Sequence, residues 1–314
     1  MPQPKGTPAL QGREDVSKLC TGASRELLLH SDTVSATCRQ FVKSRDLHRK
    51  CPRFRVSFGP KRSLGWLPFI PRAVKIEGGS VVYLKRRYCF WKTRDLSGAF
   101  KSGSFCQDAR GRWYVTFQCE TANDLPAGTG EIGIDLGLKT LAVCSDGYEI
   151  PALKHYRRYE RSLAMAQRAN NKRRVKAIHA KIANSRKHHL HEQSSKLVRE
   201  NKLIVVGNVN SSSLAKTWMA KSVLDAGWAM FRNQLVYKMA RRPQAICIIA
   251  DERWTSHTCS SCGARSGPKG IAGLGIRSWT CSCGAIHDRD RNAAMNILRF
   301  GQERLAPAEE IPVL

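Results

Sequence analysis

Four cysteines near the C-terminus have the spacing of a tetrahedral metal site. They are Cys259, Cys262, Cys281 and Cys283, and a glycine-rich loop, residues 267–275, separates the two pairs. Thiolates on two facing knuckles are ligands of structural zinc. The alternative is four unrelated thiols, but a glycine follows the second cysteine of each pair, and we expect a zinc ion here. His257 and His287 are the weaker ligand candidates, because four thiolates already complete the site.

Acidic residues could form a second metal site. Asp135 stands in the apolar segment 133–137, where burial of an acid is costly unless it binds metal or accepts hydrogen bonds. Capping of the following turn is the alternative. Asp288 and Asp290 point away from each other on a helix, so we expect Asp290 to bind metal and Asp288 to cap the helix. Two metals bridged by carboxylates suit phosphodiester hydrolysis, and such a site usually needs a third acid.

The segments around these acids alternate between strand and helix patterns. The chain has a predicted meander of three strands over 132–150, a helical hairpin over 152–200, a strand at 203–206, a helix at 217–240, a strand at 245–249 and a terminal helix at 290–304. This is the order of the ribonuclease H fold, which holds carboxylates on its first strand, near a central strand and on its last helix. We therefore expect an α/β, ribonuclease H-like domain that brings Asp135 and Asp290 together.

The N-terminal third has a different texture. Residues 1–20 are rich in Pro, Gly and charge and are predicted to be disordered. Residues 22–50 are compatible with one or two short helices. The predicted strands 54–58, 74–76, 80–84, 88–91 and 113–117 are separated by Gly and Pro, which indicates a small antiparallel barrel or sheet.

The charge balance indicates a polyanionic partner. The chain has 53 Lys and Arg against 25 Asp and Glu, a formal charge of +28, which self-repels unless nucleic acid compensates it. Twelve bases stand against the single acid Glu160 between residues 154 and 187. We expect phosphate contacts there, with a solvated hairpin as the alternative. The candidate residues are Lys154, Arg157, Arg158, Arg161, Lys172, Arg173, Arg174 and Lys176.

Neither a signal peptide nor a membrane-spanning run is found in the sequence. The eight cysteines outside the two pairs are scattered, which is typical of reduced, partly buried thiols. We therefore expect a cytoplasmic, nucleoid-associated protein.

These motifs together resemble the TnpB proteins, also called the OrfB transposase family, which are relatives of the type V CRISPR effectors. The resemblance covers about residues 60–304, and its signatures are 133–139, 216–228, 255–263 and 277–298. It implies a transposon-associated, RNA-guided DNA endonuclease with catalytic Mg²⁺, whose guide RNA pairs with target DNA. It also implies a barrel-like wedge domain with short helices, a helical recognition insertion, a RuvC-type nuclease domain and an inserted zinc ribbon.

The resemblance gives expected domain boundaries. We expect a disordered segment at 1–20, a partial wedge and recognition region at 21–125, a RuvC-like domain at 126–254 and 286–305, a zinc ribbon at 255–285 and a tail at 306–314. Family members usually open with a β-rich, aromatic segment that this sequence does not show before residue 50. The N-terminus therefore looks shortened.

The second departure from the family falls on the nuclease site. Most of the family has a catalytic Glu at the end of the strand 203–206, and this chain has Gly207, which cannot bind metal. Either the nuclease is inactive or another acid replaces that Glu. Glu252 is the best candidate because it follows the strand 245–249, while Asp251 points to the opposite face. The predicted triad is Asp135, Glu252 and Asp290.

Three functional interpretations stay open from the sequence. The first is an active guided nuclease of a mobile element. The second is a nuclease-inactive protein that still binds nucleic acid, either an RNA-guided repressor or a decayed remnant. The third is a zinc-ribbon DNA-binding protein without RNA. The distance of Glu252 from the other two acids separates the first from the second.

Overall fold

The computed structural model describes most of the chain between residues 20 and 305. The described residues are 16, 18, 20–49, 51–52, 56, 58–59, 62–122, 125–269 and 272–305. The predicted tail 306–314, nearly all of the predicted disordered segment 1–20 and most of the predicted strand 54–58 lie outside them. The chain divides into two compact units, Met1–Ala122 and Asn123–Leu314. No helix among the described residues is long and apolar enough to cross a membrane.

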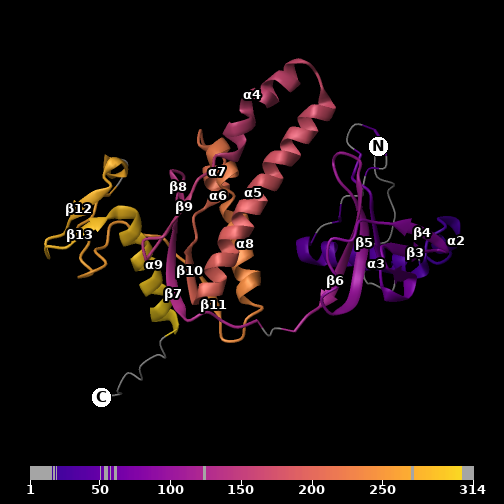
Figure 1. Ribbon diagram of the computed structural model, residues 1–314, viewed down its shortest axis with the longest axis horizontal. Helices are drawn as coiled ribbons and strands as arrows, with labels where there is room; N and C mark the ends of the chain where they lie inside the picture. The colour runs from indigo at the N-terminus through magenta and orange to yellow at the C-terminus, as the bar shows by residue number, and fades with distance from the viewer. Residues whose placement is uncertain are drawn as a thin grey trace. The chain divides into compact units, whose positions relative to one another are not determined.

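The first unit carries two antiparallel sheets and two described helices (Figure 1). One sheet has the order β1-β5-β6 and the other β2-β3-β4. The elements are α2 (Ala23–Glu26), α3 (Ser31–His48), β1 (Trp66–Phe69), β2 (Val74–Glu77), β3 (Ser80–Tyr83), β4 (Arg86–Cys89), β5 (Ala99–Gln107) and β6 (Trp113–Glu120). A small core forms where Phe69, Ala73 and Tyr83 pack against Phe100 and Phe105.

Sequence patterns missed two strands of this unit. β1 contains Pro68, and β5 has Lys, two Ser and Gly among its nine residues, so neither has the expected strand composition. β5 is a strand because β1 and β6 pair with its two edges. Gly103 is needed there, since a Cβ at this position would lie 2.5 Å from Cε2 of Phe69.

The second unit is built on one five-stranded sheet of order β11-β10-β7-β8-β9. Its strands are β7 (Gly130–Leu136), β8 (Thr140–Cys144), β9 (Glu149–Pro151), β10 (Asn201–Gly207) and β11 (Ile246–Ala250). The first three form the predicted antiparallel meander, and β10 runs parallel to both β7 and β11. The predicted order is confirmed for these strands and the helices between them. A two-stranded antiparallel sheet of β12 (Ser278–Thr280) and β13 (Ile286–Asp288), which follows β11 and precedes α9, was not predicted.

Helices cover both faces of this sheet (Figure 1). They are α4 (His155–Arg168), α5 (Lys172–Glu200), α6 (Ser211–Leu214), α7 (Ala220–Ala226), α8 (Trp228–Met239) and α9 (Arg289–Leu305). The predicted single helix 217–240 is wrong in part: Gly227, with φ of 71°, ends α7 and begins α8.

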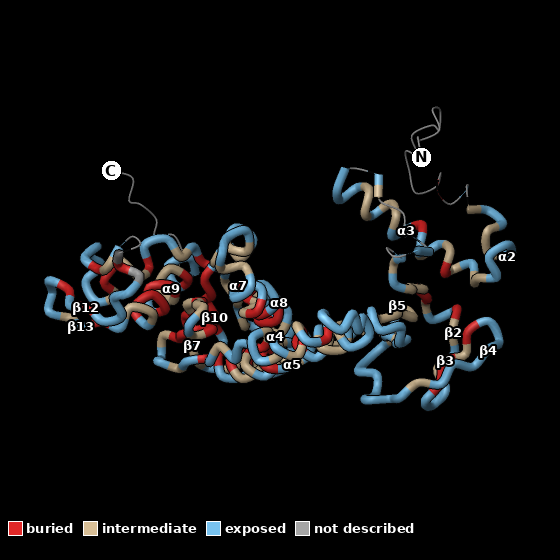
Figure 2. Tube along the Cα trace, turned by 90° about the horizontal axis from the view of Figure 1, so that it is seen from above, coloured by how far each residue is buried: buried red, intermediate tan, exposed pale blue. Residues whose placement is uncertain are grey.

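The alternation of side chains along β10 separates the two layers. Ile204 and Val206 face the core formed with α5 and α8, whereas Leu203 and Val205 pack with Ile297 of α9. The buried residues concentrate along this sheet and its helices (Figure 2). Residues 133, 135 and 207 belong to the face that α9 covers, because their strand neighbours face the other core.

Two glycines let α9 lie close to the sheet. A Cβ at Gly133 of β7 would lie 2.1 Å from the carbonyl oxygen of Ala294, and one at Gly301 of α9 would lie 2.2 Å from Cγ2 of Val205. The start of α9 is therefore fixed near the end of β7, which is where Asp290 and Asp135 stand.

Candidate active site and metal centre

Asp135 lies near the end of β7, the central strand of the sheet. Its backbone is in register with Val143 of β8, and it follows Gly133 by two residues on the face covered by α9. The apolar neighbours Ile134 and Leu136 enter the opposite core. The alternation of β7 thus presents an acid between an apolar layer and the first turn of α9.

The pKa of Asp135 responds to two other acids. Burial raises the pKa of Asp135 well above its usual value, and the charges of Glu252 and Asp290 raise it further. The positive charge of Arg289 and the backbone N–H of Leu136 oppose that rise in pKa. Like charges that disfavour each other's ionisation favour a bound cation between them. Glu252 and Asp290 thus lie close enough to act on the charge of Asp135. Among the described residues, however, the four cysteines alone place three or more ligand atoms within 4.8 Å of one another, so the three carboxylates do not all lie that close.

Glu252 fills the space that a side chain at position 207 would occupy. Gly207 at the end of β10 pairs with Ala250 of β11, and Glu252 follows two residues later. A Cβ built on Gly207 would lie 1.9 Å from Oε1 of Glu252 and 2.6 Å from its Cδ. Glycine at 207 is thus what allows the carboxyl group of Glu252 to lie at the end of β10.

The carboxyl group of Glu252 is poorly compensated. Its Oε1 is buried and has no hydrogen-bond partner among the described residues. Burial raises the pKa of Glu252, and Asp251 adds to the rise, while the backbone N–H of Val209 and the charge of Arg232 lower the pKa. An unpartnered buried oxygen is costly in a folded protein unless a further ligand satisfies it.

Arg232 of α8 is a site residue that sequence reasoning missed. Its guanidinium donates to the carbonyl oxygens of Gly207 (3.4 Å) and Val209 (3.0 Å), and its charge lowers the pKa of Glu252. It therefore holds the chain just after β10. A single arginine in an apolar helix carried no sequence signal that could have found it.

A hollow of about 600 Å³ opens beside Glu252. Its lining comes from the segment after β10 and the segment after β11: Asn208, Val209, Asn210, Ser211, Ser212, Arg232, Asp251, Glu252 and Arg253. The backbone N–H of Glu252 donates to Oδ1 of Asn208 at 3.4 Å, which ties the two segments together. Its two arginines are balanced by two acids, so the hollow is polar without a net charge.

Asp288 and Asp290 make different contacts at the start of α9. Asp288 accepts a hydrogen bond from the backbone N–H of Arg291 at 2.9 Å and so caps α9. Asp290, in the first turn of α9, lies 2.6 Å from a guanidinium nitrogen of Arg277 in a partly exposed ion pair. The prediction that Asp288 caps the helix is confirmed.

Asp251 follows the end of β11 and is exposed. Its carboxylate accepts from the backbone N–H of Arg253 (3.2 Å) and lies 3.6 Å from that guanidinium. The charges of Glu252 and Asp290 raise the pKa of Asp135, whereas Asp251 does not contribute to this shift.

The four cysteines form a compact sulfur cluster. The Sγ atoms of Cys259, Cys262, Cys281 and Cys283 all lie within 4.8 Å of one another. Cys259 and Cys283 are 3.9 Å apart, and Cys262 and Cys281 are 3.6 Å apart. A tetrahedral ion with Zn–S bonds of about 2.3 Å requires sulfurs about 3.8 Å apart. The short Cys-x-Cys half thus still reaches the geometry that zinc requires.

The local environment favours a thiolate at Cys281. The backbone N–H of Cys283, followed by the hydroxyl of Ser266 at 3.0 Å, lowers the pKa of Cys281 to about 5. Thiolates, not thiols, bind metal. The backbone N–H of Ala264 lowers the pKa of Cys262, but hydrogen bonds with the other three sulfurs raise it to about 12, so the donor set fits zinc by its spacing rather than by the charge of each thiol.

The two nearby histidines lie around this cluster. Nε2 of His287 lies 3.0 Å from Sγ of Cys259, and its ring packs 4.7 Å from that of Trp279. Nδ1 of His257 contacts the carbonyl oxygen of Gly267. Four sulfurs complete the cluster without either ring.

Two buried asparagines tie the cysteine knuckle to α9. Asn292 and Asn296 both donate through Nδ2 to the carbonyl oxygens of Thr255 and Thr258, at 2.7–3.2 Å. Oδ1 of Asn292 accepts from the backbone N–H of Ser260 at 2.9 Å. The cysteine knuckle thereby anchors the helix that carries Asp290. Both asparagines fall within the sequence signature 277–298, but the signature alone does not reveal this role.

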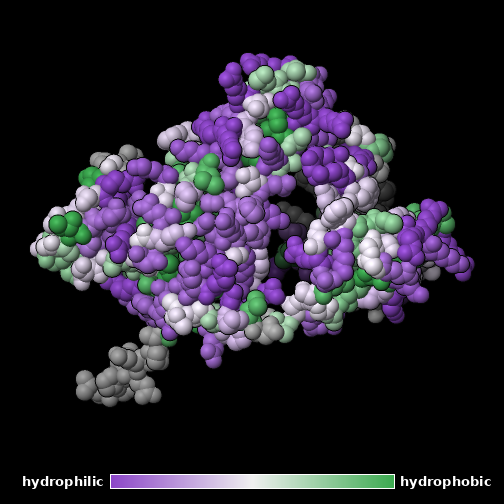
Figure 3. Space-filling view, in the orientation of Figure 1, coloured by the Kyte–Doolittle hydropathy of each residue, from purple (hydrophilic) through white to green (hydrophobic). Residues whose placement is uncertain are grey.

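The eight bases predicted to contact phosphate lie on the α4–α5 hairpin. Lys154 precedes α4, three arginines are on α4 and four bases are in the first turns of α5, and all eight are exposed. The hairpin surface seen in Figure 3 is largely hydrophilic. Arg157 pairs with Glu160 at 3.0 Å, and Lys221 shares that acid, so this one charge is partly compensated.

Comparisons with known proteins agree with these observations. Residues 115–217 match the OrfB family described as "Probable transposase", and residues 228–297 match "Cas12f1-like, TNB domain". A "Putative RNA-guided DNA endonuclease" of Streptomyces pristinaespiralis is 40% identical over 211 residues, which cover 62% of this chain and 51% of that protein. Over these residues the chain is similar to the OrfB transposases, to the Cas12f1-like TNB domain and to a TnpB-type relative.

A second relative and one solved structure extend the comparison. InsQ of Escherichia coli K12, of the same description, is 27% identical over 276 residues, covering 77% of this chain and 67% of InsQ. The fold matches a chain of the Cas12f1–sgRNA–target DNA complex with a TM-score of 0.55 at 12% identity, covering 90% of this chain and 74% of that one. This chain thus has a Cas12-like α/β fold and spans about half of the Streptomyces relative.

Proposed function

We propose that this protein belongs to the TnpB family and is a transposon-associated, RNA-guided DNA endonuclease. Its relatives' names and its family models support this activity. We assign residues 126–254 and 286–305 to a ribonuclease H-like, RuvC-type nuclease domain, 255–285 to a zinc ribbon and 21–125 to a partial wedge domain. The strand order of the five-stranded sheet, and the packing of α9 on the face of the sheet away from α5 and α8, support the nuclease assignment.

The position of Glu252 carries the proposal. Its carboxyl group lies where a side chain at Gly207 would be, so an acid remains at the end of β10 although the strand itself ends in glycine. Its charge acts on Asp135 together with that of Asp290. We infer that Asp135, Glu252 and Asp290 form the catalytic triad.

The residues present fit two kinds of metal. Asp135 and the two acids that act on its charge, one of them with an unpartnered buried oxygen, would supply the oxygen donors that Mg²⁺ prefers, and four sulfurs suit zinc. Bound divalent metal would supply an activated water and would stabilise the leaving oxygen of a phosphodiester. Arg232 would hold Glu252 beside the substrate, and Asn292 and Asn296 would keep Asp290 in place through the knuckle.

Guide RNA and target DNA are the proposed partners. The Cas12f1 chain of like fold was solved with both, and the exposed bases of α4 and α5 offer this chain a surface for phosphates. We propose that Lys154, Arg158, Arg161, Lys172, Arg173, Arg174 and Lys176 contact the nucleic acid directly. Arg157 would do so only after release from Glu160.

A second candidate function is binding without cleavage. Gly207 favours it because that position cannot bind metal itself, and the ion pair with Arg277 competes for Asp290. An RNA-guided repressor or a decayed remnant would keep the zinc ribbon and the basic hairpin and would lack metal-dependent hydrolysis.

The two functions are separated by a cleavage assay on matched acid variants. The ribonucleoprotein is purified with RNA transcribed from its native locus and is given Mg²⁺ and DNA complementary to that RNA, with randomised flanks. Glu252→Gln removes the proposed ligand, and we expect cleavage to fall by about 100-fold or more. Glu149→Gln, at an exposed acid of β9 outside the hollow, is the control and should cleave like the unchanged protein.

Two results would contradict the nuclease assignment. Cleavage that persists in Glu252→Gln would exclude Glu252 from the triad. Absence of cleavage by the unchanged ribonucleoprotein, with RNA bound, would favour the non-cleaving function.

A further inference from the structure

The first unit contains an aromatic pocket that the nuclease site does not use. Its volume is about 1150 Å³, and it opens between the two small sheets and the segment after α2. The side chains that matter to its chemistry are Arg86, Tyr88, Phe90, Phe105, Trp113 and Tyr114. None of the described lining residues is acidic. The pocket is therefore lined by aromatic rings and by one basic side chain, Arg86.

Several of its rings are only partly covered. Trp113 is 58% exposed, Tyr114 46% and Tyr88 45%, whereas Phe105 forms the floor with its ring 5.5 Å from that of Tyr88. Trp113 is held against Gly65, where a Cβ would lie 2.4 Å from its Cη2 atom. Rings held in place with open faces can stack on another flat ring system at little entropic cost.

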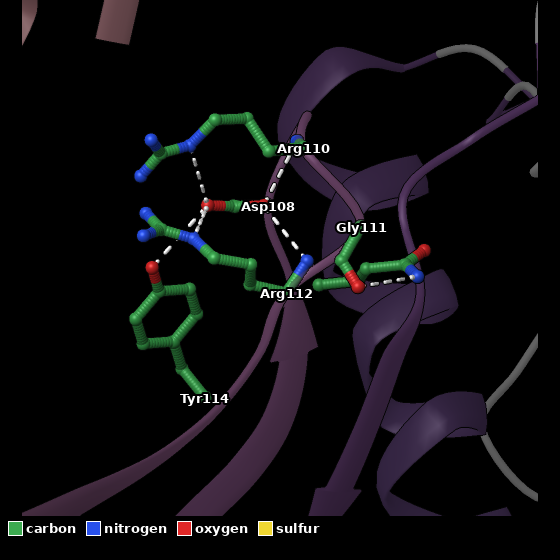
Figure 4. Close-up of polar contacts among 6 residues, drawn as sticks. Asp108, Arg110, Gly111, Arg112 and Tyr114 are labelled. Carbon is green, nitrogen blue, oxygen red and sulfur yellow. Dashed lines mark hydrogen bonds and ion pairs between the residues drawn. The ribbon is translucent and has the colours of Figure 1, made fainter. Parts of the chain in front are cut away.

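A charged turn at the end of β5 holds two arginines beside these rings (Figure 4). Oδ1 of Asp108 accepts from the backbone N–H groups of Arg110 (2.8 Å) and Arg112 (3.0 Å). Oδ2 accepts from Nε of Arg112 (2.9 Å) and from the hydroxyl of Tyr114 (3.2 Å), and lies 3.6 Å from Nε of Arg110. One acid thus fixes two guanidinium groups and a tyrosine, and a net positive charge remains.

This arrangement combines stacking surfaces with cations. The guanidinium carbon of Arg112 lies 5.6 Å from the centroid of the Tyr114 ring, and Arg86 lies in the pocket wall. Single-stranded nucleic acid is bound by aromatic side chains that stack on bases and by a basic groove that follows the phosphates. An apolar peptide or a lipid tail would use the rings but would gain nothing from the arginines.

We propose that this pocket binds unpaired nucleobases, which stack on Trp113 and Tyr88 while their phosphates pair with Arg86 and Arg112. The pocket would hold a single strand of the nucleic acid named in the proposed function, and the proposal rests on that function only for whether the strand is guide RNA or target DNA. Binding at this pocket requires neither cleavage nor the carboxylate site.

The test is equilibrium binding of fluorescein-labelled 12-nucleotide oligomers to the full-length protein, without Mg²⁺, followed by anisotropy. RNA and DNA single strands, a duplex and a strand with central abasic positions are the probes. We expect Trp113→Ala to weaken binding of at least one single strand by about tenfold, and Trp113→Phe to restore most of it. Trp91→Ala, a 90% exposed tryptophan of the same unit outside the pocket lining, is the control and should bind normally.

Further comparisons show whether the effect belongs to stacking. Abasic strands should bind weakly to the unchanged protein and no more weakly to Trp113→Ala, while duplex binding should be the same in both. Tyr88→Ala gives an independent variant if Trp113→Ala has a lowered melting temperature. Equal single-strand affinity in Trp113→Ala, Tyr88→Ala and the unchanged protein would overturn the proposal, as would equal losses for duplex and single strand.

The RNA and DNA arms identify the strand. The binding assay contains no Mg²⁺, so its result does not depend on cleavage. A protein that binds single strands through Trp113 but does not cleave DNA in the separate Mg²⁺ assay would uphold the pocket and contradict the nuclease assignment. A protein that cleaves but is insensitive to all pocket variants would do the reverse.

Discussion

The cysteine cluster and the proposed carboxylate site are built in opposite ways. The cluster takes its four ligands from two knuckles within residues 259–283, so a short stretch of sequence specifies the whole site. The carboxylate site takes its acids from β7, from the segment after β11 and from α9, which lie far apart in the sequence. A site assembled by tertiary structure depends on where a carboxyl group lies in space, so it can accept that group from a neighbouring strand.

The proposed shift of the third acid from position 207 to position 252 has a simple physical cause. β10 and β11 are parallel neighbours, and Gly207 pairs with Ala250. A side chain that begins two residues beyond Ala250 can therefore fold back over Gly207, and Glu252 does so. The loss of a side chain at 207 and the presence of an acid at 252 are two halves of one arrangement.

Breaking the cysteine cluster should have the largest effect. Structural zinc contributes about 10–16 kcal/mol in small zinc-binding peptides, so Cys281→Ser should lose the ion and unfold the knuckle. We expect zinc content to fall from one ion per chain to none, with new protease cleavage between residues 255 and 285. Cys89→Ser, an exposed thiol outside the cluster, is the control. Full zinc content in Cys281→Ser would contradict a four-thiolate site.

Cutting the link between the two sites should have an intermediate effect. Asn296 is fully buried and donates to the carbonyl oxygens of Thr255 and Thr258. Asn296→Ala should lower the free energy of unfolding by about 2 kcal/mol, measured by urea denaturation, and should also slow cleavage. Met295→Ala, a partly exposed neighbour on α9, is the control. Lowered stability with unchanged cleavage would show that the knuckle does not position Asp290.

Removing the partner of Asp290 should have the smallest effect. A partly exposed ion pair contributes up to about 1 kcal/mol, so Arg277→Gln should change stability little. If Asp290 binds metal, loss of the competing charge should tighten Mn²⁺ binding by about threefold, as followed by electron paramagnetic resonance. The control is Arg265→Gln, another arginine near the knuckle. Unchanged Mn²⁺ affinity in Arg277→Gln would indicate that Asp290 serves the ion pair alone.

The sequence predicted the second unit far better than the first. The pattern of apolar residues predicts the core strands, and the lack of Gly and Pro over residues 172–200 predicts the long helix. Both predictions succeed because burial and local propensity favour the same structure in these segments. β5 escaped prediction because its pairing partners, and not its own composition, make it a strand. The break at Gly227 depends on a positive φ that periodicity alone does not reveal.

The same division applies to the sites. Cysteine spacing predicts the sulfur cluster outright, and the acids at 135, 252 and 290 could be nominated because each ends or begins an expected element. Arg232, Asn292 and Asn296 act through contacts between distant segments, so no local pattern assigns their roles. The aromatic pocket likewise depends on how two small sheets face each other.

The relocation of the acid is tested most directly by moving it back. Glu252→Ala should abolish Mg²⁺-dependent cleavage by the ribonucleoprotein, and the added change Gly207→Glu should restore a large part of it, because the space above position 207 is then free. Gly207→Glu alone should fold poorly, since its side chain would meet Glu252. Restored cleavage in the double variant is the predicted result; full cleavage by Glu252→Ala alone would contradict the relocated triad.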